Sequence, residues 1–146
     1  MMTLGKFLIR TVIVFVAGCV LGFLGHGLWL HRDYLSLGPM MRPEAAQQAH
    51  FQWVLLGFFI YSVAIVWMYA QGNSSKPWLG QGFRFGVGIW AIGSVPMYLV
   101  NYAVAPWPGM IIVKQIAWDF IALVVLGIII AALSRNDAVR AVPAAA

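Results

Sequence analysis

The chain has 146 residues, of which 62% are hydrophobic and only 9% are charged, and its formal net charge is +5. Its mean hydropathy is +0.86. Because about a quarter of the residues in a soluble domain are charged, this composition excludes an ordinary soluble protein and indicates a membrane protein. The positive charges are spread over predicted helix ends, which favours contact with anionic lipid and not with nucleic acid.

Four apolar segments follow one another, near residues 7–30, 51–69, 83–104 and 110–133. Each has about twenty residues, enough for an α-helix to cross about 30 Å of hydrocarbon and too many for a transmembrane β-strand. These spans take up most of the chain. The sequence therefore predicts an all-α, integral membrane four-helix bundle in a single domain, with residues 135–146 as a frayed cytoplasmic tail.

Basic residues are distributed unequally between the two sides of the predicted bundle. One side, formed by the start, the second loop and the tail, holds Lys6, Arg10, Lys76, Arg84, Arg135 and Arg140, and the other side holds only Arg32, Arg42 and Lys114. Because the richer side faces the cytoplasm, we expect both termini there and residues 31–50 on the outer side. Arg10 and Arg84 are expected to extend to the cytoplasmic headgroups.

The first span ends in the stretch LGFLGHGLWLHRDYL, residues 21–35, which concentrates ionisable groups at its outer end. His26 lies among glycines inside the span, and His31, Arg32 and Asp33 follow it directly. Gly18 and Gly22 form a G-x-x-x-G pair on the face that His26 continues. Such pairs let helix backbones approach one another, so this face is predicted to pack tightly.

The loop after the first span, residues 31–50, contains helix-breaking Gly38, Pro39 and Pro43. Pro43 and Glu44 then suit the first turn of a helix, so the second helix is expected to begin before its apolar segment does. His50 lies just before that segment and is predicted to be near the outer rim.

The third span begins with a second G-x-x-x-G pair, Gly82 and Gly86, which also predicts close helix packing. Pro96 is expected to kink this span, because proline has no backbone N–H and clashes with the preceding turn. Its polar residues follow i, i+4, i+7 spacing and share one face: Ser94, Tyr98 and Asn101.

The fourth span carries Lys114, Gln115 and Asp119 on an otherwise apolar helix. Gln115 and Asp119 are four residues apart and therefore share a face. A carboxylate within a span is costly and suggests a functional site by default. The structural alternative stays open, in which Asp119 only bonds to Tyr98, Asn101 or Lys114 and holds the bundle together.

Polar residues from three spans lie at similar depths when a rise of about 1.5 Å per residue is applied. We therefore predict a polar site in the outer half of the bundle, composed of His26, Tyr98, Asn101, Gln115 and Asp119. Its predicted rim is His31, Arg32, Asp33, His50 and Lys114. An acid and an imidazole in one pocket could exchange a proton near neutral pH.

Residues 82–133 resemble uncharacterised bacterial four-span inner-membrane proteins that are catalogued as domains of unknown function. The resemblance rests on GFRFGVGIW, NYAVAPWPG and KQIAWDFIALVVLGIIIAAL, which look like their glycine-rich third helix, short hairpin and closing helix. It implies a location in the inner membrane and carries over no activity.

Two classes of function fit these patterns. The leading hypothesis is a small homo-oligomeric membrane protein that handles a proton, an ion or a small polar solute at an outer-facing site. The alternative is a structural or accessory subunit whose glycine faces dock a larger membrane complex. A haem held by His26 or His31 together with His50 is a less favoured option, and no other cofactor and no metal site are predicted. The common enzyme motifs are absent, which weighs against an enzyme without excluding one.

Overall fold

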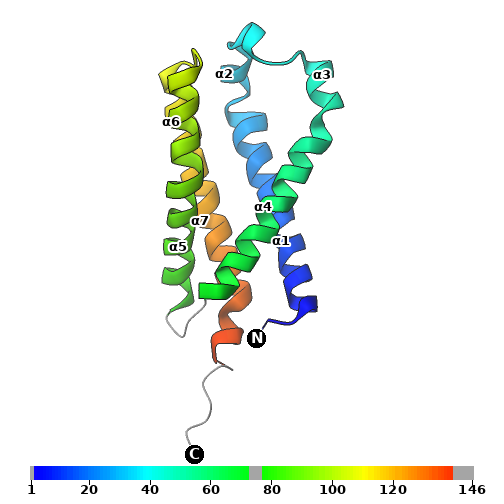
Figure 1. Cartoon of the computed structure of the whole chain (residues 1–146), viewed down its shortest axis with the longest axis vertical. Coiled ribbons are helices and arrows are strands. Elements are labelled where there is room, and N and C mark those ends of the chain that lie inside the picture. Colours follow the sequence, from blue (N-terminus) through cyan, green and yellow to red (C-terminus); the bar gives the residue numbers. More distant parts are fainter. Residues whose placement is uncertain (1, 73–76, 140–146) are drawn as a thin grey trace, which may run out of the picture.

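A computed structural model of the chain describes residues 2–72 and 77–139. Within these residues the regular structure is helical and contains no strand. Four helices are long and apolar enough to cross a membrane: Leu4–Trp29, Phe51–Gly72, Trp78–Val104 and Gly109–Asp137. The chain is therefore an all-α, multi-pass membrane protein with the architecture of a four-helix bundle (Figure 1).

The four crossings are connected by short elements. The first crossing is formed by α1 (Leu4–Gly22) and the π-helical segment η1 (Phe23–Trp29). The connection to the second crossing contains α2 (His31–Leu35), the 3₁₀ turn η2 (Gly38–Met40) and α3 (Glu44–Ala49). The second crossing is α4 (Phe51–Gly72). The third is α5 (Trp78–Ile89), the π-helical segment η3 (Trp90–Ser94) and α6 (Val95–Val104), and the fourth is α7 (Gly109–Val139).

Local signals explain several of these boundaries. The side chain of Thr3 accepts a hydrogen bond from the backbone N–H of Lys6 at 3.4 Å and caps α1. Pro43 and Pro77 lie at the N-caps of α3 and α5, where no intrahelical donor is needed. Pro96 is the second residue of α6, just after η3, so the kink expected in the third span takes the form of a widened π-helical turn.

The closest helix pair is α5 against α7, and glycines make its short distance possible. A Cβ atom on Gly82 would lie 2.6 Å from the carbonyl oxygen of Gly127, and one on Gly86 would lie 2.5 Å from that of Leu123. Gly127 in turn faces the backbone of Gly82 and Gly86. The glycine face predicted on the third span therefore meets the fourth span of the same chain.

Replacing Gly86 with alanine is expected to lower the free energy of unfolding by about 2–3 kcal/mol, because the new methyl group would collide with backbone atoms that cannot move aside. Gly88 on the same helix is the matched control, since a Cβ there meets nothing within 4 Å. Gly88→Ala should therefore be neutral or slightly stabilising. Denaturation by sodium dodecyl sulfate in mixed micelles measures both. Equal effects of the two substitutions would contradict this account of α5 and α7.

The other glycine face, Gly18 and Gly22, lies against α4. A Cβ on Gly22 would lie 2.6 Å from the ring of Phe58, so this ring fills the space above the glycine. From this crossing point the first half of α4 leans away from α2 (Figure 1). Large apolar side chains along this half are exposed: Phe51, Trp53, Val54, Leu55, Leu56, Phe59 and Ile60.

The apolar core occupies the half of the bundle that contains the start of α1 and the end of α7, here called the terminal half. Its most buried side chains are Val14, Val66, Ile130 and Ala131, each at most 1% exposed. The opposite half, which carries α2 and α3, is called the loop half. Polar residues lie on both sides of this core, with Arg10 and Asp137 in the terminal half and His26 and Asp119 toward the loop half.

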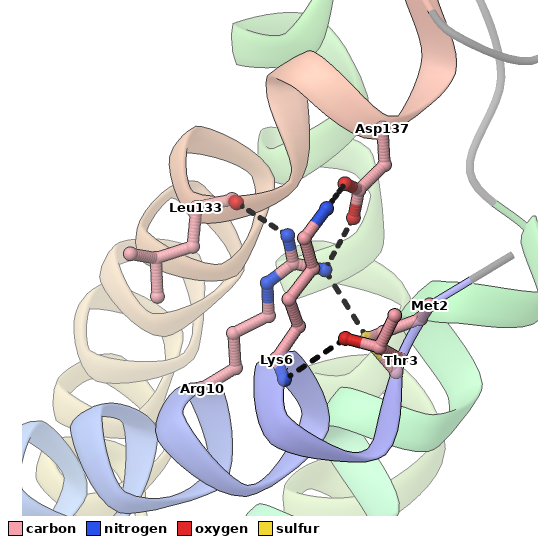
Figure 2. A network of polar contacts seen from close by, with 6 residues as sticks. All are labelled: Met2, Thr3, Lys6, Arg10, Leu133 and Asp137. Atoms are coloured by element: carbon pink, nitrogen blue, oxygen red, sulfur yellow. Dashed lines mark hydrogen bonds and ion pairs between the residues drawn. The ribbon is translucent and has the colours of Figure 1, made fainter.

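A network of charged side chains ties α1 to the end of α7 (Figure 2). Arg10 is only 7% exposed. Its guanidinium lies 2.6 Å from Oδ2 of Asp137 and donates to the Leu133 carbonyl at 2.7 Å, while the ammonium of Lys6 lies 2.6 Å from Oδ1 of Asp137. The charge of Arg10, which was expected to extend to the headgroups, is satisfied by Asp137 and the Leu133 carbonyl near the end of α7.

The end of α7 also differs from the prediction of a frayed tail over residues 135–146. The helix continues through Val139, and Asp137 is held by the network with Lys6 and Arg10. The remaining part of the predicted tail, residues 140–146, lies outside the described residues, as does Lys76 of the second loop.

Candidate functional site

His26 and Asp119 come from different crossings and face one another. His26 lies within η1, and Asp119 lies on α7. Nε2 of His26 is 3.5 Å from Oδ1 of Asp119, and the two side chains are 33% and 18% exposed. When the imidazole is protonated, the two groups form an ion pair. Because the pair is partly buried, salt screens it less than a pair on a surface.

Tyr34 on α2 connects His26 to α7 through its hydroxyl group. This hydroxyl accepts a hydrogen bond from Nε2 of Gln115 at 3.0 Å and lies 2.5 Å from Nδ1 of His26. Because the Gln115 amide nitrogen can only donate, the hydroxyl proton of Tyr34 remains available for Nδ1 of a neutral imidazole. The proton of neutral His26 is therefore at Nε2, the nitrogen that faces Asp119.

Burial keeps the hydroxyl group of Tyr34 protonated. Burial raises the pKa of Tyr34, and the hydrogen bond from Gln115 opposes that rise only in part. Tyr34 therefore retains its hydroxyl proton at neutral pH. Gln115 is 5% exposed, and its Oε1 atom is buried without a hydrogen-bond partner among the described residues.

Replacing Tyr34 with phenylalanine is expected to lower the free energy of unfolding by about 1–3 kcal/mol, because the buried amide of Gln115 loses its acceptor. The same change removes the donor to Nδ1 of His26. The ¹⁵N spectrum of His26 should then change from the Nε2–H tautomer to a mixture of both tautomers. A tautomer that is unchanged in Tyr34→Phe would contradict the role assigned to this hydroxyl.

Two further tyrosines surround the carboxylate of Asp119. Tyr98 on α6 is 8% exposed, and its hydroxyl lies within hydrogen-bonding reach of the carboxylate. Tyr61 on α4 interacts with the same carboxylate electrostatically. Asn101, which was predicted to join this group, is half-buried on α6 and does not line the cavity beside it. Asn101 and Tyr98 differ by only about 60° around α6, but Asn101 lies about 4.5 Å further toward the end of the helix, beyond the residues that line the cavity.

Asp33 and Lys114 of the predicted rim lie next to this group, on its loop side. Both carboxylate oxygens of Asp33 are 2.9 Å from Nζ of Lys114, which joins α2 to α7 next to Tyr34. His31 and Arg32 are exposed on α2. The Asp33 and Lys114 pair is therefore the polar contact that borders the site on the loop side.

His50 belongs to a different place in the fold. It ends α3, its Nδ1 lies 2.7 Å from the carbonyl oxygen of Ala46, and its Nε2 lies 3.3 Å from the guanidinium of Arg42. In Figure 1 α3 is separated from α2, because α4 leans away at this end. His50 is thus not brought to the rim that Asp33 and Lys114 form.

A cavity of about 340 Å³ lies beside the His26 and Asp119 pair. All four crossings contribute to its wall, among them Gly22 and His26, Phe58 and Tyr61, Ser94 and Tyr98, and Trp118 and Asp119. The volume falls in the lower part of the range of about 300–1,000 Å³ that small-molecule sites occupy. The site is therefore a small chamber with one acid and one imidazole in its wall.

Trp118 forms one side of this chamber, and glycine determines where it lies. Its indole N–H donates to the carbonyl oxygen of Leu21 at 3.1 Å, and its ring lies against Gly25, where a Cβ atom would overlap it. The ring of Trp29 packs at 5.7 Å from it. Gly25 therefore allows the close contact between η1 and α7 that brings His26 to Asp119.

The sequence patterns did not single out Tyr34, Trp118 or Gly25 as parts of this site. Tyr34 lies beyond the apolar segment, so it was not compared with the residues inside the spans. Its spacing of eight residues after His26 was an available signal, because about two helical turns bring such residues to the same face. Trp118 is adjacent to Asp119, but tryptophans near span ends are common and carry little information.

Comparison of the chain with protein-family models, curated proteins and solved structures found no match. Within residues 2–72 and 77–139, no group of three or more His, Cys, Asp or Glu side chains could hold a metal ion. Fold and cavity together define the class to which the chain belongs: a four-span α-helical membrane protein with a partly polar chamber between its helices.

Proposed function

We propose that the chain is a small inner-membrane protein that transfers a proton, an ion or a small polar solute at the chamber between its helices. The observation that carries this proposal is the distance of 3.5 Å between His26 and Asp119 in the wall of a cavity. Ionisable residues within a membrane are costly, and they mark solute pathways and proton relays in many membrane proteins.

A chain of polar groups leads from the loop half to this pair. It begins at the pair of Asp33 and Lys114, continues with Tyr34, and reaches Asp119 through His26. With both termini in the cytoplasm, as the basic residues favour, this chain starts at the outer face. Protons would then enter from outside and reach Asp119 by way of the imidazole.

The proposal includes a homo-oligomer. A complete path across the membrane needs more wall than a chamber of about 340 Å³ between four helices supplies. The exposed apolar side chains along the first half of α4 provide a surface on which a second copy could pack. Lipid covers this surface wherever a second copy does not.

The same surface favours a second candidate function, that of a structural or accessory subunit. In this case the first half of α4 contacts a different membrane protein, and the His26 and Asp119 pair only fixes how the helices pack. Gentle extraction followed by native mass measurement separates the two candidates. A homo-oligomer favours transfer, whereas recurring foreign subunits favour the accessory role.

The pH-dependent flux of protons through lipid vesicles containing the purified chain tests the leading proposal. Loss of this flux in both Asp119→Asn and His26→Ala would support it. Unchanged flux in both variants would overturn it.

A further inference from the structure

The chamber wall offers an incoming molecule very few free hydrogen-bonding groups. The hydroxyl of Ser62 donates to the carbonyl of Phe58 at 2.7 Å in its own helix, and the N–H of Trp118 is taken by Leu21. Both ring nitrogens of His26 face protein partners, Tyr34 and Asp119. The remaining polar groups of the wall are the hydroxyls of Tyr61, Ser94 and Tyr98, of which that of Tyr98 faces Asp119, and the carboxylate of Asp119 itself.

Most of the wall is aromatic or aliphatic. The rings of Phe58, Tyr61, Tyr98 and Trp118 and the thioether of Met97 line the chamber beside the carboxylate. The face of an aromatic ring attracts a cation, and this attraction is strongest where water is excluded. The wall thus combines one negative charge with several surfaces that favour a positive, weakly hydrated group.

This composition disfavours other ligand classes on physical grounds. A sugar or an amino acid would lose its hydration and find too few partners in return. A small metal cation requires about six oxygen ligands, and only one carboxylate is present here. An anion would be repelled by Asp119.

We propose that the chamber binds an organic cation with apolar substituents, such as a quaternary ammonium compound, next to Asp119, and that this cation exchanges with a proton. This inference rests on the proposed function and names its substrate class. The cation replaces the positive charge that protonated His26 supplies to Asp119.

Charge balance defines the exchange. When the imidazole is protonated and no organic cation is bound, ionised Asp119 is paired with an imidazolium that carries protons on both nitrogens. When the organic cation enters beside the carboxylate, the imidazolium becomes a like charge and loses the proton on Nδ1 toward Tyr34. One positive charge enters and one proton leaves, and no bond other than this N–H is broken.

The groups that face the pair come from every neighbouring element. They are Tyr34 on α2, Tyr61 on α4 and Tyr98 on α6, with the pair of Asp33 and Lys114 beyond Tyr34. The three tyrosines stay uncharged near neutral pH, and the outer pair is internally neutral. The exchange therefore involves only the Nδ1 proton of His26.

Binding of benzyltrimethylammonium to the full chain in lipid nanodiscs tests this inference, with uncharged phenylacetamide and anionic phenylacetate as probes of similar size. We expect saturable binding of the cation alone. Below the titration midpoint of the pair, its affinity should increase about tenfold for each unit by which the pH is raised, and one proton should be released per cation bound. These measurements use the unmodified chain and do not depend on a variant that folds.

Two variants that each replace a carboxylate with an amide provide a matched control. Asp119→Asn should weaken binding of the cation more than about tenfold, because the counter-ion is lost. Glu44→Gln makes the same chemical change on exposed α3 and should leave binding unchanged.

The outcomes separate this inference from the function on which it rests. If the chain conducts protons but binds the cation no better than phenylacetamide, or binds it equally at all pH values, the inference is overturned and the proposed function stands. If it binds the cation with proton release but vesicles show no proton flux, the chamber's ligand class is supported and the proposed transfer is overturned.

Discussion

Replacing Asp119 with asparagine is expected to reduce the pH-dependent proton flux through vesicles containing the chain by at least about a hundredfold, the usual effect of removing a positioned proton-transfer group. Asparagine fills the same volume and keeps one carbonyl oxygen near His26, but it cannot accept a proton. A pH-sensitive dye trapped inside the vesicles reports the flux after a step in external pH.

Two further variants show whether this loss reflects the chemistry of Asp119. Asp119→Glu keeps a titratable carboxyl group and should retain a pH-dependent flux, although at a lower rate. Glu44→Gln removes an exposed carboxylate outside the bundle and should match the unmodified chain. A flux that survives in Asp119→Asn, or that falls equally in Glu44→Gln, would contradict a role of Asp119 in proton transfer.

Replacing Asp137 with alanine is expected to lower the free energy of unfolding by about 3 kcal/mol, because it leaves the charge of Arg10 unpaired in the bundle. The guanidinium side chain is 8% exposed and would keep only the Leu133 carbonyl and the sulfur of Met2 as partners. Denaturation by sodium dodecyl sulfate in mixed micelles measures the loss.

Lys6 and Arg10 provide the matched comparison, because both contact the same carboxylate at 2.6 Å but differ in burial. The Lys6 side chain is 43% exposed, so Lys6→Ala should cost about 1 kcal/mol or less. The double variant Arg10→Ala with Asp137→Ala should lose less stability than the two single variants added together. Strict additivity would show that Arg10 and Asp137 do not stabilise one another.

The helical architecture could be predicted from sequence because the membrane imposes a simple rule on length and composition. About twenty apolar residues are needed to cross the hydrocarbon, and the helices that the structure contains are centred on such segments. Helix ends were less predictable. The fourth helix extends beyond the apolar segment because Asp137 gains partners in Lys6 and Arg10, and such long-range pairs cannot be read from local hydropathy.

Glycine spacing indicated which helix faces pack closely, but it did not indicate what they pack against. Gly82 and Gly86 meet α7 because Gly127 lies opposite them, and Gly22 meets the ring of Phe58 on α4. A single glycine in an apolar helix has no pattern of its own. Partners of this kind depend on how the helices are arranged, which spacing within one helix does not determine.

The polar site could likewise be predicted only in part. Depth alone placed His26, Tyr98 and Asp119 in one layer, and the structure brings them together. It does not bring Asn101 or His50 to them, for reasons of position along the helix and of helix direction. Asn101 lies about 4.5 Å beyond Tyr98 toward the end of α6, and His50 is carried away where α4 diverges from α2 (Figure 1).

The account depends most directly on one contact, an imidazole from η1 and a carboxylate from α7 facing each other inside the membrane. Solid-state NMR of the chain in lipid, with ¹⁵N in His26 and ¹³C in the carboxyl group of Asp119, measures it through their dipolar coupling. We predict a measurable coupling, weaker than that between Nζ of Lys114 and the carboxyl carbon of Asp33, because both Asp33 oxygens lie 2.9 Å from that nitrogen whereas Oδ1 of Asp119 lies 3.5 Å from Nε2 of His26. A clear coupling for Lys114 and Asp33 with none for His26 and Asp119 would contradict the account.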